Sequence, residues 1–226
     1  MNRLTLALDV MGGDIGPRIT IPASLSALEA DPMLSLVLFG NSQQISPLLE
    51  NAPSSLLERI QIHHCTKTID NNQGISHALR HSKGTSMRLA IEMVQKGEVQ
   101  GCVSAGNTGA LMGLSKVLLQ PLEGIQRPAL VSLLPSLPSM TGDKTVMLDL
   151  GANVECSAQN LYEFAVMGSI FAENRLNLVY PRIALLNIGV EEIKGHQSIR
   201  EAANLLEKST ALNYTGFIEG NLLLNG

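Results

Sequence analysis

The sequence predicts an α/β fold with a mostly parallel sheet. Short apolar runs rich in Leu, Val and Ile alternate with segments of helical periodicity, which is the pattern of βαβ units. Glycine turns follow several of these runs, as tight strand-to-helix connections require. With 45% hydrophobic residues among 226, the chain can bury a sizeable core, and we interpret residues 1–226 as one α/β domain.

Eight apolar runs are expected to be strands. They cover Leu4–Val10, Leu34–Phe39, Ile60–His64, Gly101–Ser104, Ala129–Leu134, Thr145–Leu150, Arg182–Ile188 and Tyr214–Ile218. Helices are expected between them, beginning near Ile19 after a proline and near Ser42 after a Gly-Asn turn. Segment Thr85–Lys96 has its apolar residues on one stripe and its charged residues at spacings of four, which predicts an amphipathic helix. The Pro/Ser/Gly-rich stretch Leu134–Gly142 is expected to turn between two strands.

The charge and cysteine content argue against several classes of protein. A formal net charge of -4 argues against a chain that coats nucleic acid or an anionic membrane through its overall field. Three cysteines without C-x-x-C spacing fit a reducing compartment and predict buried thiols rather than a disulfide or zinc framework. The N-terminus lacks the apolar region and cleavage site of a signal peptide, and no apolar stretch is long enough to span a bilayer. We therefore expect a cytoplasmic protein.

Five strand ends carry glycine beside a small polar or acidic residue. They are Asp9–Asp14, Ser104–Gly109, Asp149–Asn153, Asn187–Gly189 and Glu219–Asn221. Because parallel strands end at the same edge of a sheet, the loops there converge on one crevice. The sequence therefore predicts a ligand site built from these turns.

The turn Ser104–Gly109 leaves an apolar strand and opens a helix. Unpaired backbone N–H groups at a helix start, with glycines that let a ligand approach, suit a phosphate. The hydroxyls of Ser104 and Thr108 and the amide of Asn107 are further candidates for binding it. The alternative, equally supported by this motif, is a helix N-cap at Asn107 or Thr108.

Three carboxylates stand at strand ends, namely Asp9, Asp14 and Asp149. Each must be hydrogen-bonded or paired, because a buried charge is otherwise costly. They either orient the phosphate loop or only accept loop N–H bonds. Neither their spacing nor the histidine pair at 63–64 fits a metal site, so we predict no metal and no cofactor.

Lys194 lies between Gly189 and Gly195, beyond a strand that directs it to the same crevice. An ammonium group there can stabilise a phosphate or an oxyanion. By residue type alone, a solvated loop lysine is the simpler interpretation. The chain has no G-x-x-x-x-G-K-[ST], G-x-G-x-x-G or G-x-S-x-G, which disfavours nucleotide triphosphatases, dinucleotide dehydrogenases and α/β-hydrolases.

Five motifs, in one order along the chain, resemble those of the bacterial phosphate acyltransferase (PlsX) family. They are DVMGGD (9–14), SAGNTGALM (104–112), RPAL (127–130), LDLGAN (148–153) and the NIG…EE.KG run (187–195). The resemblance implies a three-layer, Rossmann-like fold similar to isocitrate dehydrogenases and phosphotransacetylases, and a homodimer. It also implies attack of inorganic phosphate on the thioester of acyl carrier protein, which gives acyl phosphate for phosphatidic acid synthesis.

The resemblance also implies roles for residues. Lys194 and Asn107 are expected to be catalytic. Phosphate and substrate are expected to be bound by Asp9, Gly12, Gly13, Asp14, Ser104, Gly106, Thr108, Gly109, Asn153, Asn187 and Glu191.

Two departures from the family pattern affect these expectations. Val190 stands where close relatives have a third acidic residue. The chain also stops at Gly226, whereas the family continues through further elements, so we expect a truncated catalytic domain. The C-terminal part is expected to complete the dimer and the acyl-chain surface, and any peripheral membrane association would run through it.

An acidic carrier protein calls for a basic docking patch. Arg80, Lys83 and Arg88, with His81 and Lys96, are the candidates, although a solvated helix face is the simpler interpretation. Two other functions stay open. One is a phosphotransacetylase-like enzyme that uses coenzyme A thioesters, and the other is a truncated, non-catalytic module that binds phosphate or the carrier.

Overall fold

The computed structural model describes residues 4–136, 144–189 and 196–224. The chain forms two compact units, Met1–Gln120 and Pro121–Gly226, and hydrophobic clusters lie within each of them. The single domain expected from the sequence stays a prediction. No helix within the described ranges is both long and apolar enough to cross a bilayer.

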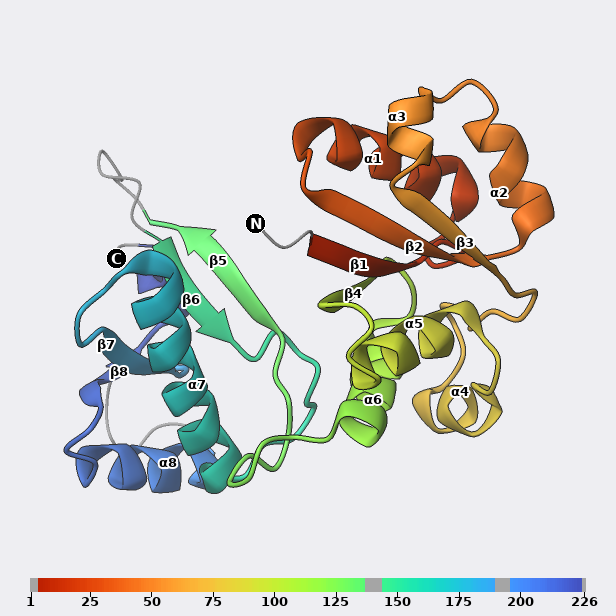
Figure 1. The fold of residues 1–226 in the computed structure, drawn as a ribbon. Helices are drawn as coiled ribbons and strands as arrows, with labels where there is room; N and C mark the ends of the chain where they lie inside the picture. The colour runs from red at the N-terminus through yellow and green to blue at the C-terminus, as the bar shows by residue number, and fades with distance from the viewer. Residues whose placement is uncertain (1–3, 137–143, 190–195, 225–226) are drawn as a thin grey trace. The chain divides into compact units, whose positions relative to one another are not determined.

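The first unit is built on a four-stranded parallel sheet (Figure 1). Its strands are β1 (Leu4–Asp9), β2 (Leu34–Gly40), β3 (Ile60–His64) and β4 (Gly101–Ser104), in the order β3-β2-β1-β4. Its helices are α1 (Pro17–Ala30), α2 (Ser42–Leu49), α3 (Ser54–Leu57), α4 (Ile75–His81), α5 (Ser86–Gln95) and α6 (Thr108–Leu119). Each of these strands lies where the sequence predicts one, to within one residue at either end.

Helices cover both faces of this sheet, which makes the unit a three-layer structure. On β2, Leu36 and Leu38 pack in one cluster with residues of α1, α2 and α3, whereas Val37 and Phe39 pack in another with Ala90 of α5. Figure 1 shows α1 to α3 on one side of the sheet and α5 and α6 on the other. Because successive side chains point to opposite faces, a strand buried on both faces reads as the continuous apolar run that predicted it.

The amphipathic helix predicted before β4 is α5. The Thr85 side chain caps it by accepting a hydrogen bond from the Arg88 N–H at 3.4 Å. Met87 and Ile91 are buried, while Arg88 and Glu92 form an ion pair of 2.6 Å on the other face. The predicted stripe and the predicted charge spacing are both confirmed.

The second unit contains one antiparallel and one parallel pair of strands. β5 (Val131–Pro135) pairs antiparallel with β6 (Lys144–Leu148), and β7 (Arg182–Leu186) pairs parallel with β8 (Asn213–Ile218). Its helices are α7 (Ala158–Leu176), α8 (Gln197–Glu207) and the 3₁₀ helix η1 (Gly220–Leu222). The predicted strands of this unit are present with ends shifted by up to two residues.

The antiparallel pair departs from the parallel pairing that βαβ units give. The connection between β5 and β6 covers only residues 136–143, of which 137–143 lie outside the described residues. A parallel pair needs a crossover of about a dozen residues or more, so a connection this short returns the chain antiparallel. The described ladders are otherwise parallel, as the fold class predicts.

Candidate functional site

The strand order places two of the glycine turns side by side. In the order β3-β2-β1-β4 the chain runs from β1 outward to β2 and β3 and then crosses to β4 on the other side of β1, so the carboxyl ends of β1 and β4 form a topological switch point. Open α/β sheets bind their ligands at such points. Asp9 at the end of β1 is the register partner of Ser104 at the end of β4. The turns 9–14 and 104–109 therefore meet at this edge, as the sequence predicts.

Gly12 and Gly106 allow the backbones of these two turns to touch. A Cβ on Gly12 would lie 2.8 Å from the Gly106 nitrogen and 2.8 Å from Asp9 Oδ2. A Cβ on Gly106 would lie 3.0 Å from the Met87 methyl group and 3.4 Å from Gly12 Cα. Gly13, next in the turn, has a φ of 88°, a conformation that favours glycine. These glycines bring the turns together, and their contact with phosphate stays a prediction.

The Asp9 side chain is buried between the turns, with 2% of its surface exposed. Its Oδ2 accepts a hydrogen bond from Ser104 Oγ at 2.7 Å, and Ser104 Oγ accepts one from the Gly106 N–H at 3.1 Å. Among the described residues, Asp9 Oδ1 has no hydrogen-bond partner of acceptable geometry. Burial raises the pKa of Asp9, and the Ser86 and Ser104 hydroxyls and two backbone amides of the turn offset this rise only in part.

Asn107 is the N-cap of α6, as the alternative interpretation expected. Its Oδ1 accepts a hydrogen bond from the Ala110 N–H at 2.9 Å. Its Nδ2 donates to three backbone carbonyls, those of Asp70 at 3.4 Å, Asn71 at 2.9 Å and Gln73 at 3.0 Å. An amide nitrogen carries two hydrogens, so both are in use. Asn107 therefore positions the turn, and its catalytic role stays a prediction.

The first two residues of α6 have different surroundings. Thr108 is exposed, and its N–H belongs to the helix start, where no intrahelical acceptor exists. A Cβ on Gly109 would lie 2.6 Å from side-chain carbons of Ile75. Glycine at 109 thus allows α4 to pack against α6, while Thr108 remains open to a ligand. Phosphate binding by either residue stays a prediction.

The loop before α4 is a part of the site that sequence reasoning missed. Asn71 Nδ2 donates to Oδ1 of the exposed Asp14 at 2.8 Å, so a loop that accepts hydrogen bonds from Asn107 also holds the first glycine turn. The available signal was the run Asp-Asn-Asn-Gln-Gly at 70–74, because such residues form turns through local hydrogen bonds. One of these bonds joins the Asn72 N–H to Asp70 Oδ1 at 2.7 Å.

In the second unit, Asp149 and Asn153 stabilise one turn. Asp149 Oδ1 accepts from the Leu130 N–H at 2.7 Å, and Oδ2 accepts from the Asn153 N–H at 2.7 Å and from Asn153 Nδ2 at 3.0 Å. Asn153 Nδ2 also donates to the Pro128 carbonyl at 3.0 Å. The carboxylate therefore accepts loop N–H bonds, which is one of the two roles considered from the sequence. Substrate binding by Asn153 stays a prediction.

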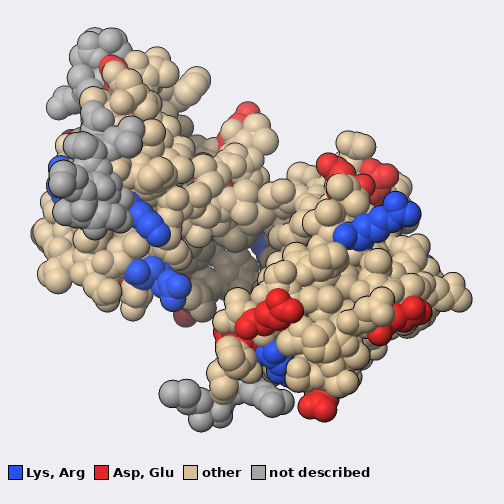
Figure 2. All heavy atoms as spheres, turned by 90° about the horizontal axis from the view of Figure 1, so that it is seen from above, with Lys and Arg blue, Asp and Glu red and all other residues tan. Residues whose placement is uncertain are grey.

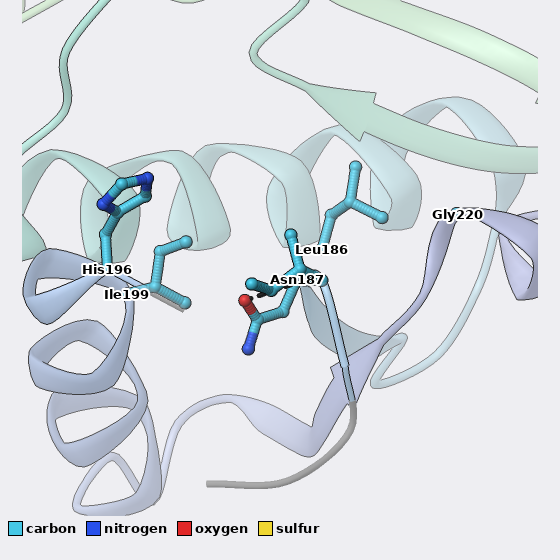
Figure 3. A pocket seen from close by; sticks show the side chains of 6 residues that line it. Leu186, Asn187, His196, Ile199 and Gly220 are labelled. Atoms are coloured by element: carbon cyan, nitrogen blue, oxygen red, sulfur yellow. Dashed lines mark hydrogen bonds between the residues drawn. The ribbon is translucent and has the colours of Figure 1, made fainter. Parts of the chain in front are cut away.

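The carboxyl ends of β7 and β8 open onto a cavity of about 560 Å³ (Figure 3). It is lined by Leu186, Asn187, Ile188, His196, Ile199 and Gly220. Figure 3 shows Ile199, on the first turn of α8, pointing toward Leu186 and Asn187 at the end of β7. Asn187 is buried, and its Oδ1 accepts a hydrogen bond from the Ile188 N–H at 2.9 Å. Lys194 and Glu191 were expected beside this strand end, but they lie outside the described residues.

The described cysteines have raised pKa values, and the described residues contain no cluster of metal ligands. Burial raises the pKa of the Cys65 thiol to about 11 and that of Cys102 to about 12, and the nearby Asp9 charge adds to both. Burial also raises the pKa of Cys156. Within the described ranges, no three His, Cys, Asp or Glu side chains gather as metal ligands.

The basic residues expected to dock a carrier differ in how far their side chains are held by contacts within the first unit. Arg88 donates to Glu92 in the ion pair and to Ser82 Oγ at 3.0 Å, so its guanidinium is held within its own unit. Arg80 and Lys83 are exposed, although Arg80 Nε donates to the Ser76 carbonyl at 3.0 Å. On the face drawn in Figure 2, Lys and Arg atoms form separate small groups. Docking through these residues stays a prediction.

The expected site residues thus fall into three sets. The first unit brings together Asp9, Gly12, Gly13, Asp14, Ser104, Gly106, Asn107, Thr108 and Gly109 around two adjoining turns. Asn153 and Asn187 belong to different turns of the second unit. The remaining two, Lys194 and Glu191, are not described.

The strand order and the adjoining glycine turns define an α/β protein of the phosphotransacetylase fold. The phosphotransacetylase from Streptococcus pyogenes aligns with a TM-score of 0.66 over 96% of this chain and 68% of its own, and its 17% sequence identity makes this a likeness of fold alone. By sequence, the chain belongs to the fatty acid synthesis protein family, whose sequence model matches residues 4–226. The predicted fold class and family resemblance are thereby confirmed.

Two curated relatives are similar along the whole of this chain. It is 77% identical over 226 residues to the phosphate acyltransferase of Pasteurella multocida (strain Pm70). It is 76% identical over 226 residues to the phosphate acyltransferase of Mannheimia succiniciproducens. The chain spans 66% of the length of each relative.

Proposed function

We propose that the chain acts as a phosphate acyltransferase. In this reaction an oxygen of inorganic phosphate attacks the thioester carbonyl of an acyl carrier protein, a C–O bond forms, and the C–S bond breaks to give acyl phosphate and the carrier thiol. The observation that carries the proposal is 77% identity, along all of this chain, to a protein named phosphate acyltransferase. The name of the matching family, fatty acid synthesis protein, agrees with it.

The geometry of the first unit supports this chemistry. Phosphate is itself the nucleophile, so no covalent intermediate with the protein is required. The protein must hold an anion in position and stabilise the oxyanion that forms on the carbonyl. The start of α6 supplies backbone N–H groups at the switch point of the sheet, beside the two glycine turns, and Thr108 is exposed there.

The roles of Lys194 and the homodimer rest on the motif resemblance, carrier docking rests on the basic residues of 80–88, and the cytoplasmic location rests on the cysteine content and the N-terminal sequence. Lys194 stabilises the oxyanion, and Arg80 and Lys83 attract the acidic carrier. The protein works as a homodimer in the cytoplasm.

Release of thiol from acyl-[acyl carrier protein], measured with and without phosphate, tests the proposal. We expect release that depends on phosphate and falls about a hundredfold in Lys194→Ala, the scale of losing one oxyanion donor. Lys208→Ala is the matched control, because Lys208 is an exposed C-cap residue of α8, and its rate should equal that of the unchanged protein.

Two other outcomes would replace the proposal. Turnover of acyl-coenzyme A in preference to the carrier would make the protein a phosphotransacetylase. Thermal stabilisation by phosphate without any thiol release would make it a binding module.

A further inference from the structure

A buried carboxyl group lies where the proposed function places an anion. Asp9 Oδ2 is 2.7 Å from Ser104 Oγ, and Ser104 Oγ in turn accepts the Gly106 N–H. With Asp9 ionised, the hydroxyl hydrogen of Ser104 is donated to the carboxylate. Ser104 then offers an approaching phosphate only an oxygen lone pair, and the carboxylate charge repels it.

The groups that act on Asp9 do little to neutralise its charge. They are the Ser86 hydroxyl of α5, the Ser104 hydroxyl after β4, and the backbone amides of Met11 and Gly12. Among the described residues, the titratable groups whose pKa the Asp9 charge raises at this site are two thiols, Cys65 after β3 and Cys102 on β4, and burial keeps both neutral. No cation is among the described groups that act on it, and Oδ1 has no partner of acceptable geometry there. An ionised Asp9 is therefore poorly compensated in this site.

We propose that binding of a phosphate dianion at the two glycine turns is coupled to the uptake of one proton by Asp9. The proton comes from solvent and forms an O–H bond on Oδ2, and no other covalent bond changes. The hydrogen bond between the two side chains then reverses, so that Asp9 donates to Ser104 Oγ. The Ser104 hydroxyl becomes free to donate its hydrogen to a phosphate oxygen while still accepting the Gly106 N–H.

Asp9 is in this view a positioning residue that acts on the anion through Ser104. Uptake of the proton removes the repulsion between two like charges in a water-poor site. The raised pKa of Asp9, which burial causes, lowers the free energy needed to protonate it and so agrees with the geometry. The identity of the anion as phosphate rests on the proposed function, whereas the coupling itself does not.

Sulfate is a suitable probe, because it resembles the phosphate dianion but does not titrate near neutral pH. Its binding to the whole chain is measured by calorimetry in buffers of different ionisation enthalpy, which counts the protons taken up. We expect uptake approaching one proton above the folded pKa of Asp9. The affinity for sulfate should fall about tenfold per pH unit in that range, as expected for one linked proton.

Two variants make the test specific. Asp9→Asn keeps a group that donates to Ser104 but cannot titrate, so it should bind sulfate without proton uptake and with an affinity independent of pH. Glu50→Gln is the control, since Glu50 is an exposed carboxylate at the C-cap of α2, outside the two turns, and it should retain the uptake.

Unfolding measurements show whether Asp9→Asn is folded. A carboxyl whose folded pKa is raised stabilises the protein below its unfolded pKa and loses that stabilisation as pH rises through the folded value. The stability of the variant relative to the unchanged protein should therefore increase as pH rises through the folded pKa of Asp9.

The proposal is overturned if sulfate does not bind, if it binds without proton uptake, or if Asp9→Asn takes up the proton as well. These outcomes are distinct from failure of the proposed function. Proton-coupled sulfate binding without acyl transfer leaves the coupling standing, and acyl transfer without coupled binding refutes the coupling alone.

Discussion

Replacing Asn107 separates its capping hydrogen bond from its bonds to the loop before α4. Asn107→Ala removes the bond to the Ala110 N–H and the bonds to the carbonyls of Asn71 and Gln73. The bond to the Asp70 carbonyl, at 3.4 Å, is too long to add much. Loss of an N-cap costs about 1 kcal/mol, and loss of each further hydrogen bond about 1 kcal/mol, so the variant should lose about 3 kcal/mol of unfolding free energy. Asn107→Ser keeps a capping oxygen and should lose about 2 kcal/mol.

Urea unfolding followed by circular dichroism measures both losses. Asn41 provides the control, because it caps α2 through a single bond to the Gln43 N–H at 3.0 Å and no loop bond from its amide is seen among the described residues. Asn41→Ala should lose about 1 kcal/mol, and Asn41→Ser close to nothing. If Asn107→Ser is as stable as the unchanged protein, the loop bonds contribute nothing and the positioning role of this amide is refuted.

Two further predictions concern Arg59 and two cysteines of the first unit. Arg59 donates to the backbone carbonyls of Leu28, Asp31, Leu34 and Ser55 at 2.7 to 3.4 Å, so Arg59→Ala should lower the unfolding free energy by about 2 kcal/mol or more, and Arg59→Lys by less, in the same urea assay. Equal stability of the alanine and lysine variants would contradict it. Because the pKa values of Cys65 and Cys102 are raised to about 11 and about 12, both thiols should react with a disulfide reagent at about pH 8 only as fast as the protein opens. Mass spectrometry of the labelled peptides would show this, and immediate labelling of Cys102 in the native protein would disprove it.

The eight strands of the described part of the chain could be predicted from the sequence because each is a local run of apolar residues. Burial on both faces of β2 made the run continuous, and no longer-range information was needed. The apolar runs did not indicate whether β5 and β6 pair parallel or antiparallel. The antiparallel direction follows from the short connection between the two strands, and the apolar pattern of each strand carries no information about that connection.

The candidate site was predictable to a smaller extent. Glycines and small polar residues after β1 and β4 identified the two turns, since tight connections and close approaches require them. The hydrogen bonds of Asn107 to the loop at 70–73 join residues more than thirty positions apart, and no periodicity or spacing records such a contact. The Asp-Asn-Asn-Gln-Gly run indicated a turn, but nothing in it indicated which residue the turn would meet.

The contacts of the two turns also change which groups are available for a ligand. Gly12 and Gly106 lie against each other's backbone. Both amide hydrogens of Asn107 are donated to the loop before α4, and the hydroxyl hydrogen of Ser104 is donated to Asp9. Side chains that the sequence suggests as ligand contacts are therefore used to hold the turns and the loop of the site in place. What these contacts leave open is the helix start at Thr108 with its backbone N–H groups. An anion bound there accepts hydrogen bonds from the backbone. In the proposed coupling, it also accepts one from the Ser104 hydroxyl, but only after Asp9 is protonated and no longer accepts that hydrogen. The protonation of Asp9 then affects the affinity for the anion.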